Sequence, residues 1–435
     1  MLRFRPIARL QTPKTRKDAL MTARSVSMLA VLGLVAASST ALAAADEKLK
    51  AAAEQEKAPL IETLREMVMT ESGSGDAEGL KKMADFTEAR LKALGASTER
   101  RKTTAGTRAD MVIATFKGSG TRKLMLIAHM DTVYQRGILA SEPYHVDGNR
   151  IYGPGIADDK GGIAVVLHAL KMLKDAGWKD YATLTVSFNP DEEVDSIGSG
   201  EIIAELADQH DVVLSCEPTA ASPPAKNDAL LLGASGTATA KMEVKGRASH
   251  AGAAPDLGRN ALIELAHQLL QAKDVAKSIP GTQLNWTTAQ AGTVRNQIPE
   301  KAEAGADIRL TIPDGVAKLQ AALDEKLKTK LVPDTETTVT IIAGRPPFVA
   351  SERGRALAQE GQAIYAEIDR KLDIAEMTGG GTDAGYASRS GKAVVVESFG
   401  LAGFGYHARD EFIDTNSIVP RLYLMSRMLI EQGKK

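Results

Sequence analysis

The stretch KLMLIAHMD, residues 123–131, decides the fold class. Its first six residues form a short run that is apolar after Lys123, and His129 and Asp131 follow directly. A run of this length and character is typical of a strand buried on both faces of a parallel sheet. Polar residues at the end of such a strand lie where open sheets bind their ligands.

The chain on the C-terminal side of this stretch alternates strands with helices. The apolar runs are typical of buried strands, and the longer segments between them have the periodicity of helices. We therefore predict an α/β domain with a mostly parallel sheet and helices on both faces. The predicted strands are 123–128, 183–188 and 211–215, and the predicted helices are 161–175 and 199–207.

The pattern changes after Gly233. The next elements follow the order β-α-β-β-α-β, which is the split βαβ (ferredoxin-like) motif. Its strands are predicted over 237–244, 283–289, 303–310 and 337–342, and its helices over 260–273 and 314–328. After Pro346 the α/β pattern resumes, with a helix over 353–368 and a strand over 393–396. We predict a catalytic domain in two parts, 44–233 and 346–435, and an inserted dimerisation domain over 234–345.

The N-terminus has the pattern of a secretory signal peptide. Arg24 precedes the apolar core MLAVLGLVAA (28–37), and Ala41-Leu42-Ala43 is a small-x-small cleavage site. We expect residues 1–43 to be removed and the mature protein to be periplasmic or secreted. Translation could start at Met1 or at Met21.

The charge of the remaining chain argues against two classes of partner. Residues 1–43 contain seven of the 54 basic residues and one of the 55 acidic residues, so the rest carries a net charge of −7. Such a surface repels nucleic acid and anionic membranes, and we expect a small-molecule partner instead. Cys216 is the single cysteine, so no intrachain disulfide is expected.

Acidic and histidine residues follow three predicted strands directly: His129 and Asp131 after the first, 191–193 (DEE) after the second, and Glu217 after the third. These strand ends meet at one edge of a parallel sheet. Zinc binds imidazole nitrogen and carboxylate oxygen in open catalytic sites. Two zinc ions about 3.5–4 Å apart also need a bridging carboxylate. The pattern therefore predicts a metal site at this edge.

Seven motifs, in order from about Pro59 to the C-terminus, resemble those of the bacterial folate-hydrolysing glutamate carboxypeptidases, within the dinuclear-zinc aminoacylase/carboxypeptidase family. They are HMDTV (129–133), GIADDKGG (155–162), NPDEEVDSIGS (189–199), CEPT (216–219), SHAGAAPDLGRNA (249–261), GGGTDA (379–384) and GFGYH (403–407). The resemblance implies two zinc ions per subunit. The implied ligands are His129 and Glu217 for one ion, Glu193 and His407 for the other, and Asp158 between them.

The resemblance also implies roles for other residues of these motifs. Glu192 would be the general base, and Asp131 would orient His129, as metal-bound imidazoles usually require. Asp159 would support the site or cap a helix. Cys216 is a further candidate ligand. Side chains alternate between the two faces of a strand, however, so the side chain of Cys216 is expected to point away from that of Glu217.

The resemblance implies a catalytic role for His250, which would reach the active site of the partner subunit in a homodimer and stabilise the transition state. Substrate binding is implied at four further positions. Arg309 would hold a substrate carboxylate, and Asn296 would donate to that carboxylate or to the reacting carbonyl. Gly380 and Arg345 would complete the substrate-binding residues.

One stretch departs from the family pattern. Glutamate-specific relatives carry polar and basic groups before their Gly-x-Ser-Gly segment, whereas this chain has Leu230, Leu231 and Leu232 there. Lys226 or Arg345 could supply a charge from elsewhere. We predict a metallocarboxypeptidase that releases a C-terminal glutamate or a more apolar residue. An N-acyl-amino-acid deacylase is the nearest alternative, and a non-catalytic, metal-bound periplasmic binding protein is the alternative of another class.

Overall fold

A computed structural model describes residues 44–106, 109–222 and 225–435. The expected signal peptide lies outside these residues. No helix among the described residues is long and apolar enough to cross a membrane.

The central sheet has six strands in the order β1-β2-β6-β3-β7-β19. Strands β6, β3, β7 and β19 run parallel, whereas β1 and β2 are antiparallel to their neighbours. The sheet is therefore mixed: the four strands predicted from the sequence run parallel, and β1 and β2 add an antiparallel side. The six strands of the central sheet are β1 (Ser97–Lys102), β2 (Asp110–Lys117), β3 (Lys123–His129), β6 (Thr183–Asn189), β7 (Val212–Ser215) and β19 (Val394–Val396).

The prediction missed β1 and β2. Strand β1 reads STERRK and forms the edge of the sheet, with every residue at least partly exposed. Charged side chains are common on edge strands, so no apolar run marks this one. Its pairing with β2 completes the antiparallel side of the sheet.

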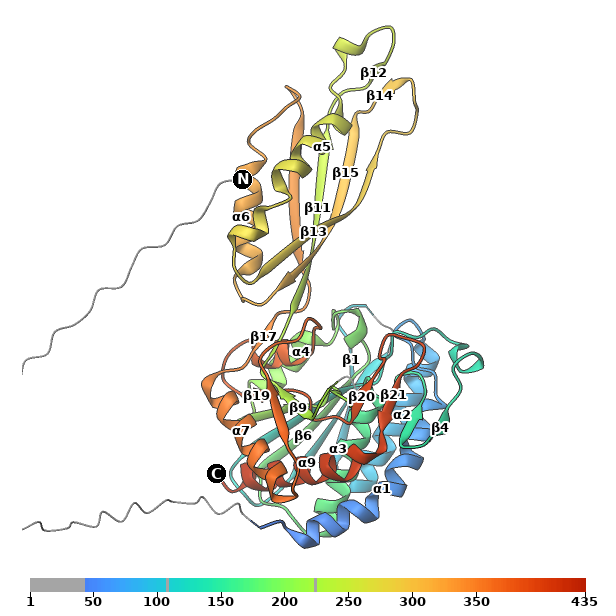
Figure 1. Cartoon of the computed structure of the whole chain (residues 1–435), viewed down its shortest axis with the longest axis vertical. Helices are drawn as coiled ribbons and strands as arrows, with labels where there is room; N and C mark the ends of the chain where they lie inside the picture. Colours follow the sequence, from blue (N-terminus) through green and yellow to red (C-terminus); the bar gives the residue numbers. More distant parts are fainter. Residues whose placement is uncertain (1–43, 107–108, 223–224) are drawn as a thin grey trace, which may run out of the picture. The chain divides into compact units, whose positions relative to one another are not determined.

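Both faces of the sheet are covered, as predicted. In β3, Leu124, Leu126 and Ala128 join one core cluster, and Met125 and Ile127 join another. This division follows from the alternation of side chains along a strand. The first cluster contains α1 (Glu47–Val68), α2 (Ala77–Leu94), α3 (Lys160–Asp175), α7 (Glu352–Glu367) and α9 (Ile418–Gly433) (Figure 1). The second contains α4 (Gly200–Ala207) and α8 (Ala384–Ser388).

A separate small domain carries an antiparallel sheet of order β13-β15-β11-β16, with α5 and α6 on one face (Figure 1). Chain order and strand order together are those of the split βαβ motif, as predicted. Alternate residues of β15 are buried against the helices, and among the described residues this core shares no member with the other two. Its elements are β11 (Gly236–Lys245), α5 (Ala261–Ala272), β13 (Thr282–Ala291), β15 (Lys301–Leu310), α6 (Gly315–Lys326) and β16 (Glu336–Ala343).

Smaller sheets position the remaining loops. A five-stranded sheet of order β4-β5-β21-β20-β8 places the turn with His407 between β20 and β21. Its strands are β4 (His145–Asp147), β5 (Arg150–Tyr152), β8 (Thr219–Ala220), β20 (Ala402–Phe404) and β21 (Phe412–Asp414). Three two-stranded pairs are β9 (Asp228–Leu231) with β18 (Leu372–Ala375), β10 (Gly233–Ala234) with β17 (Phe348–Val349), and β12 (Ser249–His250) with β14 (Gln297–Ile298).

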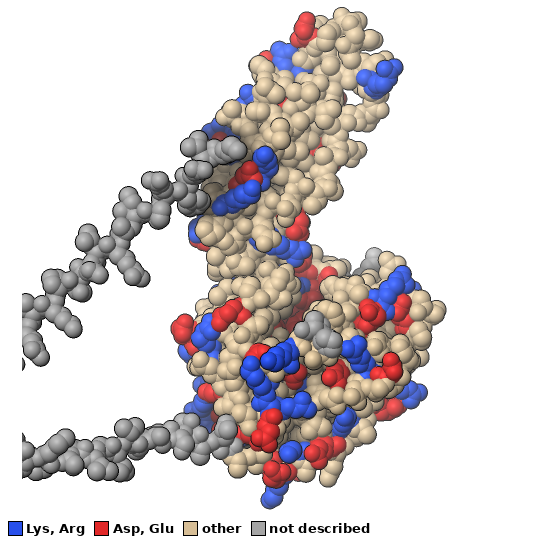
Figure 2. All heavy atoms as spheres, viewed as in Figure 1, with Lys and Arg blue, Asp and Glu red and all other residues tan. Residues whose placement is uncertain are grey.

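The surface carries both signs of charge. Lys and Arg side chains alternate with Asp and Glu side chains over the visible face of the larger domain (Figure 2). Many of them form exposed ion pairs, such as Arg65 with Glu62 and Lys81 with Asp85. The visible face of that domain therefore has no continuous basic surface to which a polyanion could bind.

Candidate metal and substrate site

The five side chains implied as ligands meet at the carboxyl ends of the parallel strands. Asp158 Oδ1 lies 2.9 Å from His129 Nε2, and Asp158 Oδ2 lies 3.3 Å from His407 Nε2. Glu217 Oε1 is 3.6 Å from His129 Nε2, and Glu193 Oε2 is 2.9 Å from His407 Nε2. One carboxylate thus stands between two histidines, each of which has a second carboxylate of its own.

The donor set fits divalent metal. His129, Glu192 and Glu217 offer ligand atoms within 4.8 Å of one another, as do His129, Asp158 and Glu193. Imidazole nitrogen and carboxylate oxygen are the donors that zinc prefers. Burial raises the pKa of Glu192, Glu193 and Glu217, because it disfavours their charged forms. Bound cations would offset the repulsion among these carboxylates.

The two histidines and Asp158 stabilise one another electrostatically. Burial opposes ionisation of Asp158, but hydrogen bonds with His129 and His407 outweigh it and lower the pKa of Asp158. The hydrogen bonds to Asp158 and Glu193 raise the pKa of His407 to about 10. The neighbouring Asp159 caps α3 instead, by accepting from Gly162 N at 3.1 Å.

Asp131 connects the metal ligands beneath the site. Its Oδ1 lies 3.3 Å from His129 Nδ1. The same carboxylate accepts from the backbone N–H groups of Glu192 (3.0 Å) and Glu193 (3.1 Å), and from Ser74 Oγ (2.7 Å). Asp131 therefore sets the position of His129 relative to the turn that carries the candidate base.

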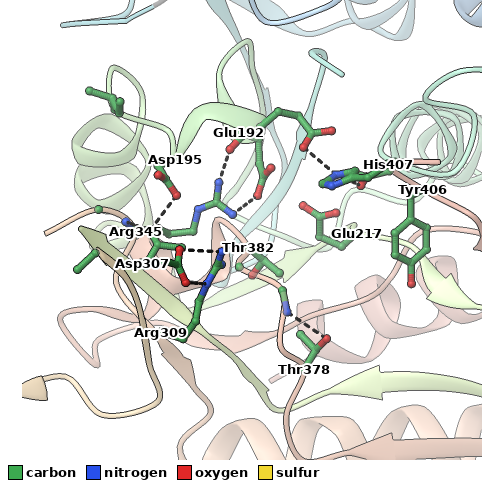
Figure 3. A pocket seen from close by; sticks show the side chains of 18 of the residues that line it. Glu192, Asp195, Glu217, Asp307, Arg309, Arg345, Thr378, Thr382, Tyr406 and His407 are labelled. Atoms are coloured by element: carbon green, nitrogen blue, oxygen red, sulfur yellow. Dashed lines mark hydrogen bonds and ion pairs between the residues drawn. The ribbon is translucent and has the colours of Figure 1, made fainter. Parts of the chain in front are cut away.

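Arg345 holds Glu192. The guanidinium contacts both the carboxylate and the carbonyl oxygen of Glu192 (Figure 3), and the Arg345 residue is only 5% exposed. The first residues of the small domain meet the same turn, because Thr237 Oγ1 donates to Asp195 Oδ1 at 2.8 Å. In this structure Arg345 is thus committed to the candidate base and not to a substrate side chain.

A cleft of about 830 Å³ opens over these residues. Arg309 and Gly380 line it, as expected for substrate-binding positions. Arg309 is paired with Asp307 through Nε (3.1 Å) and Nη2 (3.3 Å), which leaves the Nη1/Nη2 edge for another carboxylate (Figure 3). Leu231 is buried but lines the cleft, whereas Leu230 and Leu232 belong to the main core. Lys226 is exposed and does not line the cleft.

The structure does not bring His250 and Asn296 to this cleft, since neither residue lines it. It does bring the two together: Ala251 N donates to Asn296 O at 2.9 Å, next to the β12–β14 pair. His250 is exposed, and its Nδ1 accepts from Gly252 N (3.2 Å) and Ala253 N (3.0 Å). In the neutral ring this leaves the proton on Nε2.

Sequence reasoning assigned no supporting role to several carboxylates. Glu397 Oε1 accepts from Glu217 N at 3.2 Å, and its place directly after β19 is the same end-of-strand pattern used for the other ligands. Asp383 lies in the GGGTDA motif and accepts from Asn189 Nδ2 at 2.8 Å. Burial raises the pKa of Asp191 to about 6 beneath the turn that carries Glu192. Glu411 follows no recognisable pattern in the sequence.

Cys216 is not a ligand in this arrangement. Its thiol lies 3.7 Å from Leu214 O, and the residue is fully buried in the main core. Burial raises the pKa of this thiol well above its usual range, which disfavours the thiolate that zinc binds.

Comparisons with known proteins give a matching family and several relatives. The model of the peptidase family M20/M25/M40 matches residues 125–431. Carboxypeptidase G2 of Pseudomonas sp. (strain RS-16) is 44% identical over 409 residues, 94% of this chain and 97% of the relative. Succinyl-diaminopimelate desuccinylase of Stenotrophomonas maltophilia (strain R551-3) is 30% identical over 72% of this chain and 86% of the relative.

Solved structures show the same fold. The aminopeptidase PepT of Bacillus cereus superposes with a TM-score of 0.69 at 20% identity, covering 87% of this chain and 99% of the other. An M20 family metallo-carboxypeptidase of Sulfolobus solfataricus gives a TM-score of 0.67 at 16% identity, over 86% and 99% of the chains.

Replacing Asp131 with Asn tests its role beneath the site. The amide nitrogen cannot accept, so a backbone N–H of Glu192 or Glu193 loses its partner. We expect Asp131→Asn to weaken metal affinity by about 10- to 100-fold, as measured by competition with a chelator. Asp211→Asn is the matched control, because Asp211 accepts from Lys123 N (2.8 Å) at the opposite end of β3. Equal metal affinity in both variants would contradict this role.

Proposed function

Since the chain belongs to the peptidase family M20/M25/M40, we propose that it uses two zinc ions to hydrolyse the amide bond next to a free carboxylate. The chain is a carboxypeptidase G2-like metallocarboxypeptidase. One observation carries the two-ion proposal: the two oxygens of Asp158 face two different histidines, each with its own second carboxylate. His129 and Glu217 would hold one ion, and Glu193 and His407 the other.

Two zinc ions bound there would lower the pKa of a water molecule and polarise the scissile carbonyl. Glu192 is buried beside the ligands, where its carboxylate can take a proton from the attacking water and return it to the leaving amine. Arg345 and Asp131 hold Glu192 for both transfers. The Nη1/Nη2 edge of Arg309 would bind the free carboxylate of the substrate, which makes the enzyme act at chain ends.

Glu192→Gln tests this function. The amide keeps the size of the side chain but cannot carry the proton, so we expect turnover to fall by about 10²–10⁴-fold. Zinc content should stay at about two ions per chain by metal analysis. Glu201→Gln, on the exposed pair with Arg389, is the control. Undiminished turnover in Glu192→Gln would overturn the proposal. A zinc-loaded native protein that hydrolyses no folate, acyl-amino-acid or dipeptide substrate would indicate a binding protein instead.

A deacylase remains the second candidate, because one relative over 72% of the chain is named a succinyl-diaminopimelate desuccinylase. The chemistry at the reacting amide would be the same. The same panel of substrates distinguishes the two functions: a preference for small N-acyl groups indicates a deacylase, and a preference for larger acyl or peptide parts indicates a carboxypeptidase.

The side of the cleft near Leu231 favours an apolar C-terminal residue. Leu231, Ala238 and Ile342 all line the cleft, whereas no lysine among the described residues does. The other arginine that lines it in the described chain, Arg345, is paired with Glu192. A buried glutamate side chain would therefore find no lysine and, apart from Arg309, no available arginine among the described residues that line the cleft.

We expect substrates ending in Phe or Leu to have higher specificity constants than those ending in Glu. Leu231→Lys should raise the relative preference for Glu by about tenfold or more, and Leu231→Met should not. The measurement is kcat/KM for matched substrates. A native preference for Glu on the order of a hundredfold, about 2.7 kcal/mol, would contradict this expectation and show that Lys226 or Arg345 compensates.

We also propose a homodimer in which His250 and Asn296 complete the cleft of the partner subunit. Strand β13 is an edge of the small sheet, and α5 exposes Leu262, Ile263 and Leu270. Pairing these surfaces about a two-fold axis would bury both the sheet edge and the apolar helix face. The proton on His250 Nε2 would then donate to the oxyanion of the transition state.

Mixing subunits tests the dimer. His250→Ala should lower turnover by about 10²–10³, the usual cost of one oxyanion donor, without loss of zinc. A heterodimer of His250→Ala and Glu192→Ala chains should regain one working site, with His250 from one chain and Glu192 from the other. If subunit exchange is confirmed and no activity returns, His250 does not act across the interface.

Export to the periplasm is proposed on the N-terminal pattern. Arg24, the apolar core 28–37 and the Ala-Leu-Ala site support cleavage before Ala44. An acidic mature chain acting on small substrates is compatible with that compartment.

A further inference from the structure

Glu411 lies where two ligand-bearing loops meet. It stands four residues after His407, directly before β21, and is only 2% exposed. Its carboxylate has four partners. Oε1 accepts from Ala157 N (2.8 Å) and Asp158 N (3.0 Å), and Oε2 lies 2.9 Å from Gly155 N and 2.8 Å from Tyr134 Oη.

The loop held by Glu411 carries the carboxylate between the two histidines. Three of its N–H groups point at one side chain, so a single carboxylate sets the path of the backbone through Asp158. Gly155 makes this path possible: its φ is +69°, and a Cβ there would lie 2.3 Å from Thr132 Cγ2. Buried N–H groups without an acceptor are costly, so the loop depends on Glu411 for its shape.

The same residue is tied to the loop of His407. The Glu411 carbonyl accepts from Gly153 N at 3.1 Å, so both its backbone and its side chain hold the Asp158 loop. Tyr134 Oη contacts both Glu411 Oε2 and, at 2.6 Å, Ala408 O, next to His407. Glu411 therefore joins the two loops on either side of the His407–Asp158 pair.

Lys160 is a second buried charged residue that holds this loop. Its Nζ donates to Pro154 O (3.1 Å) and Thr70 O (3.2 Å), and the residue is only 1% exposed. Three N–H groups of the loop thus donate to the carboxylate of Glu411, and the carbonyl of Pro154 in the same loop accepts from the ammonium group of Lys160.

The other half of the site has different supports. His129 ends β3 and contacts Asp131, and Glu217 N donates to Glu397. Neither His129 nor Glu217 contacts Glu411 in any interaction recorded for the described residues. Loss of Glu411 should therefore disturb the two halves unequally.

We infer that Glu411 is a positioning residue that sets the distance between Asp158 and His407, and with it the affinity of the metal position that these two share with Glu193. This inference rests on the proposed two-metal function. Glu411 touches no reacting atom and acts only through the ligands.

The experiment that checks this inference is Glu411→Gln. The amide has an NH₂ group in place of one of the two carboxylate oxygens. Whichever oxygen is replaced, at least one backbone N–H of the loop then faces a hydrogen-bond donor instead of an acceptor. The native protein and the variant are equilibrated with graded concentrations of a zinc chelator, and retained zinc is measured. We expect the zinc ion held by His407 to bind Glu411→Gln with about 10- to 100-fold weaker affinity. The other ion, which also has Asp158 as a ligand, should be weakened by a clearly smaller factor. Turnover should fall in parallel, with KM unchanged.

Glu264→Gln is the matched control. Glu264 is also a fully buried carboxylate that accepts from two backbone N–H groups, Leu331 N (2.9 Å) and Val332 N (2.6 Å), but in the small domain. It should retain both zinc ions with native affinity. Tyr134→Phe removes one of the four contacts of Glu411, and it should weaken the same ion by a few fold even if Glu411→Gln fails to fold.

The outcomes separate the inference from the function on which it rests. Two zinc ions of native affinity in Glu411→Gln, or in a folded Tyr134→Phe, would overturn the inference alone. So would equal weakening of both ions, or the same loss in Glu264→Gln, because these indicate a general structural role. A native protein that binds fewer than two zinc ions would overturn the proposed function and the inference with it.

Discussion

The carboxylate of Asp158 is the contact on which the site depends. Its two oxygens lie 2.9 Å from His129 and 3.3 Å from His407. These histidines come from the two parts of the larger domain, one before and one after the small domain in the sequence. Glu192, Glu193 and Glu217 crowd around this group, and burial makes each of them harder to ionise. A cluster of this many buried acids is stable only with cations among them or with protons on them.

The cluster is supported by a second set of carboxylates that accept backbone N–H groups. Asp131 takes those of Glu192 and Glu193, Glu397 takes that of Glu217, and Glu411 takes three from the loop of Asp158. A carboxylate with several N–H partners holds a loop more firmly than a neutral acceptor does. The loops of Glu193, Glu217 and Asp158 are therefore each positioned by an acid outside the set of candidate ligands.

The small domain contributes to the site from a core of its own. Arg309 extends from β15 into the cleft, and Arg345 and Thr237, at the two chain connections to this domain, contact the turn of Glu192. The packing of the small sheet thus bears on the candidate base as well as on substrate binding. His250 and Asn296 lie together elsewhere in the same domain and are not part of this cleft.

Much of this arrangement was predictable from local pattern. Buried strands such as 123–128 and 183–188 are marked by short apolar runs, and the β-α-β-β-α-β order identified the small sheet before its pairing was known. Residues that directly follow parallel strands had to share one edge, which brought His129, Glu193 and Glu217 together. The family resemblance added His407 and the choice of Asp158 over Asp159, which spacing alone did not supply.

The tertiary structure decided what depends on contacts between distant segments. The charged strand β1 forms by pairing with β2, and no apolar run announces it. From its sequence, Arg345 could have faced a substrate side chain. In the folded chain it lies where the small domain joins the larger domain, and there it pairs with Glu192. Glu411 lies more than 250 positions from the N–H groups it accepts. Sequence by itself determined the buried parallel strands and the residues that follow them, because an apolar run and its neighbours are local properties. Only the folded chain determined which buried acid holds which loop, because that depends on where segments far apart in sequence come together.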